Sequence, residues 1–500
     1  MTATKKYIAT EPTQQEIRNH VEAIKNAVVA GGGGSGVTPH ITVFAPTGSE
    51  VTASKGQAVL TAEESNGIWQ FNVPSLGDWV ISCIKDGRTG KRTVSVDEVR
   101  EYKVRVAHGY RYGFRIHESE GNCAARVEYL FDAVGMTPAH MNFSTGIFDY
   151  GDWGDKWFVA ENKPCMLKRD GTVDYYLDPN NYNLKEDGTA SDVSNTGYDG
   201  NAMSEIPKVW VKRYTDGDWR YTIFSDVQYD DEYLQDAYIR ADGTAGEHFY
   251  WSMFGGSGGA AMIRSLSGQT RAGSLTAQQE VDGAKANGSL WYTHTWSRRE
   301  LIKDLLILMG KSTNTQAVFG MGNCRSATSA SGILPTGTLK NMGQFFGYND
   351  ATHQVKVFHI EAFWGDMWDR TAGCMNDHGT IWVKMNPTGQ GYRVTDTVGY
   401  TNTGITVPNT ADNNPYYGYI NGVNCSKYGT IPVTITGSDS TFYADAFWAN
   451  NGQLDYLFVG AGAHNAAGVG GACAFDVYAV PAYAAWDFGC GLSCDEPAAA

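Results

Sequence analysis

The side chains best suited to chemistry lie near the end of the chain, in the stretch 460–487. It combines aromatic residues such as Phe475 and Tyr478 with the hydrogen-bonding side chains of His464 and Asp476. Aromatic rings give a large contact area at low entropic cost, and polar groups orient a ligand through hydrogen bonds. This chemistry is that of recognition, and it suits a sugar or a protein as the ligand.

The same stretch follows neither helical nor strand periodicity for long, and it is rich in glycine. Irregular, glycine-rich backbone usually runs over the surface, where loops carry function. A plainer alternative is a surface loop whose Phe and Tyr side chains pack onto the core. If the stretch is a binding face, we expect Trp448, Trp486 and Gly489 to belong to the rigid frame that holds it.

Composition predicts the class of fold that positions this stretch. The 500 residues include 59 Gly, 28 Tyr, 20 Phe and 14 Trp, and only 19% are charged. Such usage favours strands and turns over helices. We therefore expect a mainly β protein with some α structure (α+β), divided into about two to four domains.

Charge and hydropathy narrow the classes of partner. The formal net charge of −15 argues against nucleic acid, because phosphate binding needs clustered Lys and Arg. No apolar run approaches the roughly 20 residues that span a bilayer, so we expect no membrane insertion. The opening residues do not resemble a signal segment, which predicts synthesis and folding in the cytosol. The nine dispersed cysteines are then expected to be buried and reduced.

The chain divides at a glycine-rich tether. Residues 1–36 carry this tether and, over 13–30, β-branched residues at the a and d spacing of a short coiled coil. Three copies are favoured, and the alternative is an amphipathic helix docked on its own or another protein. Residues 37–108 predict a small immunoglobulin-type β-sandwich, and residues 109–500 form one large, loop-rich domain.

Local patterns predict the elements inside these domains. The turn signal Asp86-Gly87 separates two strands of the sandwich. In the large domain, Ser297 to Glu300 has the form of a capping box, and apolar residues follow at helical spacing until Gly310, which predicts a core helix. The predicted sandwich strands are 40–44, 58–61, 68–73, 79–82, 92–96 and 102–106.

Three further kinds of chemistry have weaker signals. Cys490 and Cys494 lack a second metal-binding pair, and their acidic neighbours lower thiol reactivity. The Asp- and Asn-rich loop 178–201 does not fit a calcium-binding loop, so we assign no metal and no cofactor. No Ser-His-Asp order or nucleophile elbow is visible, and we expect no enzyme. Carboxylates available to a polysaccharide-cleaving pair, without distinctive spacing, are Asp230, Asp231, Glu232, Glu361 and Asp366.

Six short sequence segments, taken in their order along the chain, resemble the C-terminal half of tail-fibre and receptor-binding proteins encoded by phages and prophages of gut Firmicutes. The family has a C-type-lectin-like fold shared with the formylglycine-generating-enzyme group, whose Trp-rich strand and turn are similar to residues 358–370 here. The resemblance covers about residues 110–494. The six segments are Lys163 to Lys168, Asp170 to Tyr175, Asp199 to Met203, Pro207 to Trp210, Glu361 to Trp368 and Trp486 to Cys494.

This resemblance implies a ligand-binding tip on a virion appendage. In several such proteins a diversity-generating retroelement rewrites scattered positions while frame residues stay fixed. On that hypothesis Trp448, Trp486 and Gly489 belong to the frame. The ligand contacts then fall at Ala463, His464, Asn465, Phe475, Asp476, Tyr478, Ala479, Tyr483, Ala485 and Asp487.

The sequence thus predicts a homotrimeric phage tail-fibre adhesin in the virion, assembled in the host cytoplasm. Its partners are a bacterial surface receptor, glycan or protein, and other tail or baseplate proteins that contact the N-terminal helix. Weak contacts at single sites suffice, because three linked copies raise the effective concentration. A structural baseplate component is the main alternative, and a tail-associated polysaccharide depolymerase is a weaker one.

Overall fold

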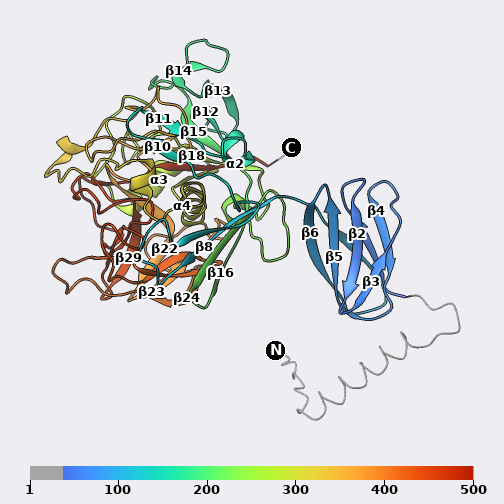
Figure 1. Ribbon diagram of the computed structural model, residues 1–500. Helices are drawn as coiled ribbons and strands as arrows, with labels where there is room; N and C mark the ends of the chain where they lie inside the picture. Colours follow the sequence, from blue (N-terminus) through green and yellow to red (C-terminus); the bar gives the residue numbers. More distant parts are fainter. Residues whose placement is uncertain (1–37, 499–500) are drawn as a thin grey trace, which may run out of the picture. The chain divides into compact units, whose positions relative to one another are not determined.

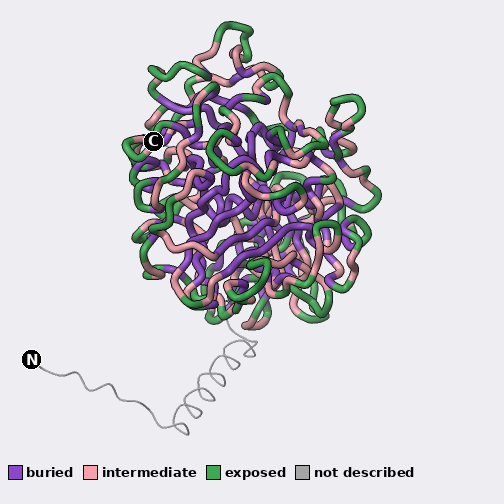
Figure 2. Tube along the Cα trace, turned by 90° about the vertical axis from the view of Figure 1, so that its left-hand side faces the viewer, coloured by how far each residue is buried: buried purple, intermediate pink, exposed green. Residues whose placement is uncertain are grey.

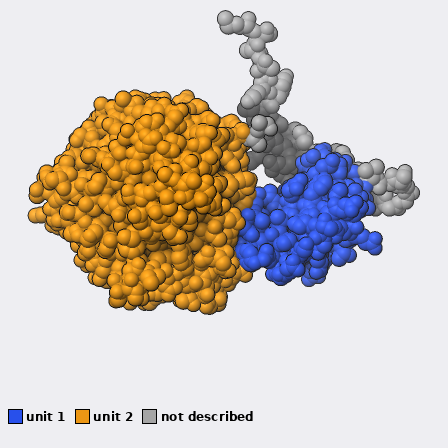
Figure 3. Space-filling view, turned by 90° about the horizontal axis from the view of Figure 1, so that it is seen from above, with its two compact units in different colours: residues 1–110, 225–233 blue, residues 111–224, 234–500 orange. Residues whose placement is uncertain are grey.

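The structure is a computed structural model in which residues 38–498 are described. This part of the chain is mainly β, with 39% strand and 8% helix, which confirms the class predicted from composition. It falls into two compact units, residues 38–110 with 225–233 and residues 111–224 with 234–498 (Figure 3). The predicted helix over 13–30 and its glycine-rich tether lie outside the described residues.

The smaller unit holds two β-sheets around one apolar core. Inward-facing residues of both sheets, among them Ile41, Trp69 and Trp79, form a single buried cluster. They alternate with more exposed residues, so burying one face of each sheet holds the two together. The sheets are β4-β1-β7 (Ile68–Asn72, His40–Phe44, Glu101–Arg105) and β3-β2-β5-β6 (Ala58–Thr61, Glu50–Lys55, Gly77–Lys85, Arg88–Val96).

The turn between β5 and β6 shows how local sequence sets the register here. Lys85 pairs with Arg88, so Asp86 and Gly87 alone make the turn, and both have positive φ, at 51° and 75°. Two successive positive φ angles give a turn whose twist matches the strands it joins. The six predicted strands are all present. Strand β2 was not predicted, because its Glu-Val-Thr-Ala-Ser-Lys sequence is mostly small or polar.

The larger unit is built on three sheets and several short ribbons (Figure 1). One sheet is β14-β13-β12-β15-β18-β32-β19 (Asn181–Lys185, Val173–Asp178, Lys163–Lys168, Gly200–Pro207, His248–Ser252, Leu492–Asp495, Trp291–Thr293). A second is β24-β23-β22-β29-β30-β28-β25 (Thr401–Thr406, Thr380–Val383, Trp368–Asp377, Leu454–Val459, Phe475–Val477, Ala446–Ala449, Gly418–Tyr419), with β31 (Phe488–Gly489) beside β22. The third is β16-β17-β8-β9 (Trp210–Asp216, Trp219–Ser225, Arg111–His117, Val127–Phe131).

Short elements complete the unit. The ribbons are β10-β11 (His140–Asn142, Ile147–Asp149), β20-β21 (Lys356–Val357, Ile360–Glu361) and β26-β27 (Gly422–Ser426, Gly429–Thr434). The helices are α2 (Trp157–Ala160), α3 (Ala277–Lys285), α4 (Trp296–Gly310) and α5 (Thr315–Phe319), with 3-10 turns η1 (Asp236–Tyr238) and η2 (Ala330–Gly332). In this unit buried segments run through the middle and exposed loops lie around them (Figure 2).

Helix α4 confirms the predicted core helix but not its predicted start. Thr295 is the N-cap, and Ser297 lies inside the helix, so the capping box is wrong. The reason is that Glu300 is used elsewhere, since its carboxylate accepts hydrogen bonds from the backbone N–H and the hydroxyl of Thr430. A capping box does form in α3, between Thr276 and Gln279, where no helix was predicted.

None of the helices among residues 38–498 combines the length and apolar character that a bilayer crossing requires.

Candidate ligand-binding surface

The structure separates the predicted contact residues into an interior and an outer group. Ala463, Phe475, Asp476 and Asp487 are buried, with at most 7% of each residue exposed. His464, Asn465, Tyr478, Ala479 and Ala485 are half-buried, and Tyr483 is exposed at 47%. A buried side chain offers no contact area to a ligand on the surface. The four interior residues therefore support the face rather than form it.

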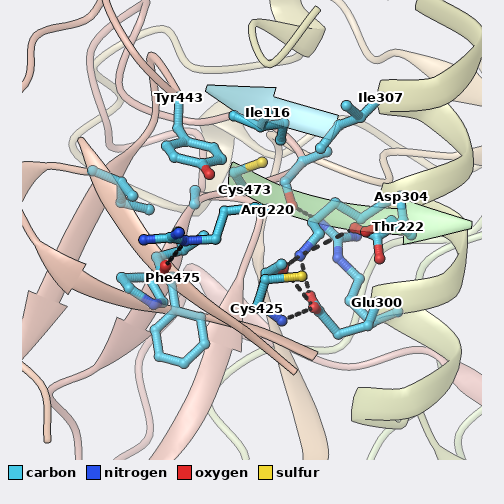
Figure 4. A pocket seen from close by; sticks show the side chains of 18 of the residues that line it. Ile116, Arg220, Thr222, Glu300, Asp304, Ile307, Cys425, Tyr443, Cys473 and Phe475 are labelled. Carbon is cyan, nitrogen blue, oxygen red and sulfur yellow. Dashed lines mark hydrogen bonds and ion pairs between the residues drawn. The ribbon is translucent and has the colours of Figure 1, made fainter. Parts of the chain in front are cut away.

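Phe475 illustrates this correction. It sits on β30 and points into an internal cavity under α4 (Figure 4). Its ring packs edge-on against Trp296 and stacks with Phe447, at centroid distances of 5.8 Å in both cases. β30 is an interior strand of its sheet, and all three of its residues are buried, so both faces of the sheet are covered there and the apolar ring lies in the core.

The cavity of Figure 4 is too small for a ligand. Its volume is about 30 Å³, which is the share of one water molecule in the liquid. Charged groups of α4 line it, and Lys303 donates to the carboxylate of Glu300. Burial lowers the pKa of Lys303, but Glu300 and Asp304 outweigh burial, and the net shift is upward. The cavity is therefore part of a closed ionic core.

Tyrosines form the outer part of the predicted stretch. Tyr478 packs at the rim of the cluster around Trp448, and its ring lies 5.9 Å from that of Tyr416, which is 55% exposed. Tyr483 is fixed through its backbone, because its carbonyl accepts a hydrogen bond of 2.7 Å from the buried guanidinium of Arg370. These side chains are held on a rigid support and remain accessible.

His464 and Asn465 are tied to neighbouring backbone and side chains. The Nδ1 atom of His464 lies 2.6 Å from a carboxylate oxygen of Asp487. The two atoms do not form a hydrogen bond, so this is a close contact between the imidazole ring and the carboxylate. Asn465 accepts a hydrogen bond of 2.9 Å from the backbone of Gly462. Both residues thus brace their loop as well as border the surface.

An open cleft lies beside this stretch, at Trp486. Its volume is about 300 Å³, at the lower end of the range for small-molecule sites. Trp486 was predicted to be frame, and the structure instead makes it a wall of the cleft, whereas Trp448 and Gly489 are buried. The other lining residues come from two loops, at Thr270 to Ser274 and at Ala330 to Pro335. Neither loop carries a motif, so sequence gave no signal for them.

Two loops of the cleft are locked together. The backbone N–H of Ser274 donates to the carbonyl of Ala485 at 2.8 Å. A Cβ atom at Gly273 would lie 2.6 Å from the carbonyl oxygen of Trp486, closer than real Cβ contacts come. Glycine is therefore required for this close approach, and the wall that bears Trp486 is fixed in position.

Arg271 forms the floor of the cleft. Its guanidinium lies 3.2 Å from Asp366 and 3.6 Å from Asp369, and all three side chains are buried. Burial raises the pKa of Asp369, but His294, Arg271 and Arg299 outweigh it and hold that pKa below its usual value. The carboxylates of Asp366 and Asp369 thus neutralise the positive charge of Arg271.

Below this floor lies a trio that the sequence did not reveal. Ser252 Oγ is 2.9 Å from His294 Nε2, and His294 Nδ1 is 2.9 Å from Asp369 Oδ2, as in a charge-relay triad. All three residues are at least 95% buried, and burial lowers the pKa of His294. A Cβ atom at Gly491 would lie within 2.6 Å of both Ser252 and His294. No room is left there for a substrate carbonyl, so this trio is structural.

The carboxylates that the sequence offered for a polysaccharide-cleaving pair also make internal contacts. Asp366 accepts hydrogen bonds from Asn323, Leu334 and Arg271, and Glu361 accepts two from backbone N–H groups. Asp231 pairs with Arg92 in the smaller unit at 2.8 Å. Carboxylates in such contacts serve the fold. The five carboxylates do not belong to one unit. The smaller unit holds Asp230, Asp231 and Glu232, and the larger unit holds Glu361 and Asp366.

The cysteines are free thiols wherever the structure describes them. Cys490 and Cys494 are buried, and burial raises the pKa of each thiol well above its ordinary value. Across residues 38–498 no three His, Cys, Asp or Glu side chains converge as metal ligands would. In the loop 178–201, the carboxylate of Asp178 accepts from the backbone of Asn180 and Asn181.

No protein-family model matches the sequence, and no curated protein is significantly similar to it.

Proposed function

We propose that this chain is the receptor-binding protein of a phage tail fibre and attaches the virion to a glycan or protein on a bacterial surface. The observation that carries the proposal is the pairing of an open cleft at Trp486 with the accessible rings of Tyr416, Tyr478 and Tyr483. Exposed aromatic side chains gathered beside a concave site are typical of interaction surfaces. The absence of a free acid–base pair in the cleft lining, among the described residues, favours binding over hydrolysis.

In this proposal the two units have different tasks. The smaller one is an immunoglobulin-like spacer, an assignment supported by its seven strands in two sheets around one core. The larger one is a C-type-lectin-like tip, an assignment supported by the Trp-rich segment 361–370, which is buried and enters β22, an interior strand of its sheet. Retroelement diversification would act on the outer residues of the predicted contact set, which are His464, Asn465, Tyr478, Ala479, Tyr483 and Ala485.

The proposed assembly is a homotrimer joined through residues 13–30, which also contact other tail or baseplate proteins. Light scattering of the full chain is expected to give three times the 54.5 kDa of one chain. A single-chain mass would contradict the trimer while leaving the binding proposal open to its own test.

Adsorption to whole cells tests the function itself. Fluorescently labelled full-length protein is incubated with a panel of intact gut Firmicutes, and bound fluorescence is measured against concentration. The proposal predicts saturable binding to some strains and none to others. Absence of saturable binding on every strain would contradict it and favour a structural baseplate component.

A further inference from the structure

The cleft beside Trp486 has the features of a specific ligand site. We infer that it binds one or two rings of a neutral saccharide, with the apolar face of a ring against the Trp486 indole and hydroxyl groups towards Thr270 and Ser274. This inference rests on the proposed function and names the receptor chemistry that the cleft selects. The predicted contact stretch and the cleft meet at Trp486, so one receptor can engage both.

The lining fits a sugar better than a protein surface. The exposed Thr270 and Ser274 supply hydroxyl groups, and the half-buried Ile333 and Leu334 supply apolar surface opposite them. Sugars have the same dual character, with C–H faces and hydroxyl edges, whereas a protein partner buries about 800 Å² of a broader patch. A concave site of about 300 Å³ therefore selects a small, hydroxyl-rich group.

Charge decides between neutral and acidic sugars. The only arginine in the lining, Arg271, faces the two carboxylates of Asp366 and Asp369. Burial lowers the pKa of the adjacent His294, which keeps that ring neutral near pH 7. Arg299 also acts on Asp369, so two positive and two negative side chains balance under the cleft, and the whole chain has a formal charge of −15. An acidic sugar therefore meets no uncompensated positive charge there and is disfavoured by the charge of the chain, whereas a neutral sugar is not.

The cleft is also formed in advance of binding. Ser274 has a φ of 58° and is held there by its hydrogen bond to Ala485, and Gly273 touches the Trp486 carbonyl. On the other side, Leu334 donates its backbone N–H to Asp366 at 2.8 Å. Walls fixed in this way lose little conformational entropy when a ligand enters.

A glycan array tests the inference directly. The full-length protein is applied to oligosaccharides of glucose, galactose, rhamnose and N-acetylglucosamine, with glucuronic and sialic acid glycans as the acidic set. Binding to at least one neutral glycan is expected, with weaker binding to the acidic set. Trp486→Ala should weaken that binding about tenfold or more, because ring stacking and area are lost together. Trp219→Ala, on β17 outside the cleft, is the matched control and should leave it unchanged.

A second variant guards against loss of folding. Thr270→Val with Ser274→Ala keeps the shape of the cleft and removes two hydroxyl groups, and it should weaken binding several-fold. Equal binding by wild type and both cleft variants would overturn the inference, as would a preference for acidic glycans or a lack of neutral binders. Adsorption to cells that survives Trp486→Ala and periodate treatment but not protease would identify a protein receptor. That result would reject the saccharide and leave the proposed adhesin intact.

Discussion

The cavity under α4 and the cleft beside Trp486 are both bordered by arginine and paired carboxylates, yet they differ in access. The first has room for about one water and is lined by Phe475, Glu300 and Lys303. The second has ten times that volume and opens beside exposed hydroxyl and aromatic side chains. Polar residues and internal space therefore do not mark a site by themselves. Access to a surface and a preformed wall distinguish the candidate site from the ionic core.

The largest expected effect breaks the ionic core. Lys303→Met leaves Glu300 and Asp304 with less positive charge in a dry interior, and it should cost about 3–5 kcal/mol of unfolding free energy. Urea unfolding of the full chain measures this cost. Glu300→Gln added to the same variant should recover part of it, because the uncompensated charge is removed. Equal stability of wild type and Lys303→Met would show that the cavity is wetter and more open than described.

The second prediction compares two residues that the sequence placed on the same face. Phe475→Ala should destabilise the chain by about 3 kcal/mol, near the low end for Phe because the adjacent cavity lets neighbours relax. Tyr483→Ala should change stability by only about 1 kcal/mol, because its side chain is 47% exposed and loses mainly the edge-on contact with Phe488. Urea midpoints of the two variants give both values. Similar losses in both would erase the division into interior and outer groups.

The third prediction concerns pH and the buried Asp445. Burial raises the pKa of its carboxyl to about 8, from an ordinary value of 3.8. Between pH 4 and pH 8 the folded state therefore keeps a proton on Asp445 that the unfolded state has lost. The contribution of Asp445 is fully present below pH 4 and is lost as pH rises through 8, with a slope of up to about 1.4 kcal/mol per pH unit.

Asp445→Asn should remove that slope. Other buried groups have pKa values of about 7, so the difference between variant and wild type, rather than the wild-type slope alone, isolates Asp445. These groups are Glu280, Lys356, Glu361, Asp455 and Asp476. Unfolding free energies at pH 5, 6, 7 and 8 are compared between wild type and variant. A slope that is unchanged in Asp445→Asn would mean that this carboxyl is ionised in the folded protein at neutral pH.

The smallest effect on stability is expected at the cleft. Trp486→Ala should leave the urea midpoint within experimental scatter of wild type, apart from a small loss of packing against His464. A loss of several kcal/mol would show that Trp486 belongs to the frame, as the sequence alone predicted. The contrast with Phe475→Ala would then disappear.

Local patterns predicted what local forces determine. Alternation in β1 and the Asp86-Gly87 turn specify strands and register from a few adjacent residues. The apolar spacing in α4 predicted a helix. The predicted first residue of that helix was wrong, because Glu300 accepts a hydrogen bond from Thr430, far along the chain, instead of capping the helix.

The candidate site depends on long-range packing, which sequence patterns do not report. Trp486, Arg271 and the loop at Ile333 come together in the folded chain, and no local sequence pattern links the three. Phe475 and Tyr483 have similar sequence surroundings and opposite burial, because Phe475 lies in a strand that is buried on both faces and Tyr483 lies in a loop. The position of a residue in the folded chain, rather than its type, decided whether it lies on the surface or in the core.

The most direct test is the affinity of the full-length protein for a strain that it adsorbs to, measured by whole-cell binding isotherms. Wild type, Trp219→Ala and the combined Tyr483→Ala and Trp486→Ala variant are compared, with urea midpoints as the check on folding. The account predicts unchanged binding for Trp219→Ala and at least a tenfold weaker affinity for the combined variant at equal stability. Full affinity in the combined variant would contradict the claim that the accessible residues of 478–487 form the receptor-binding surface.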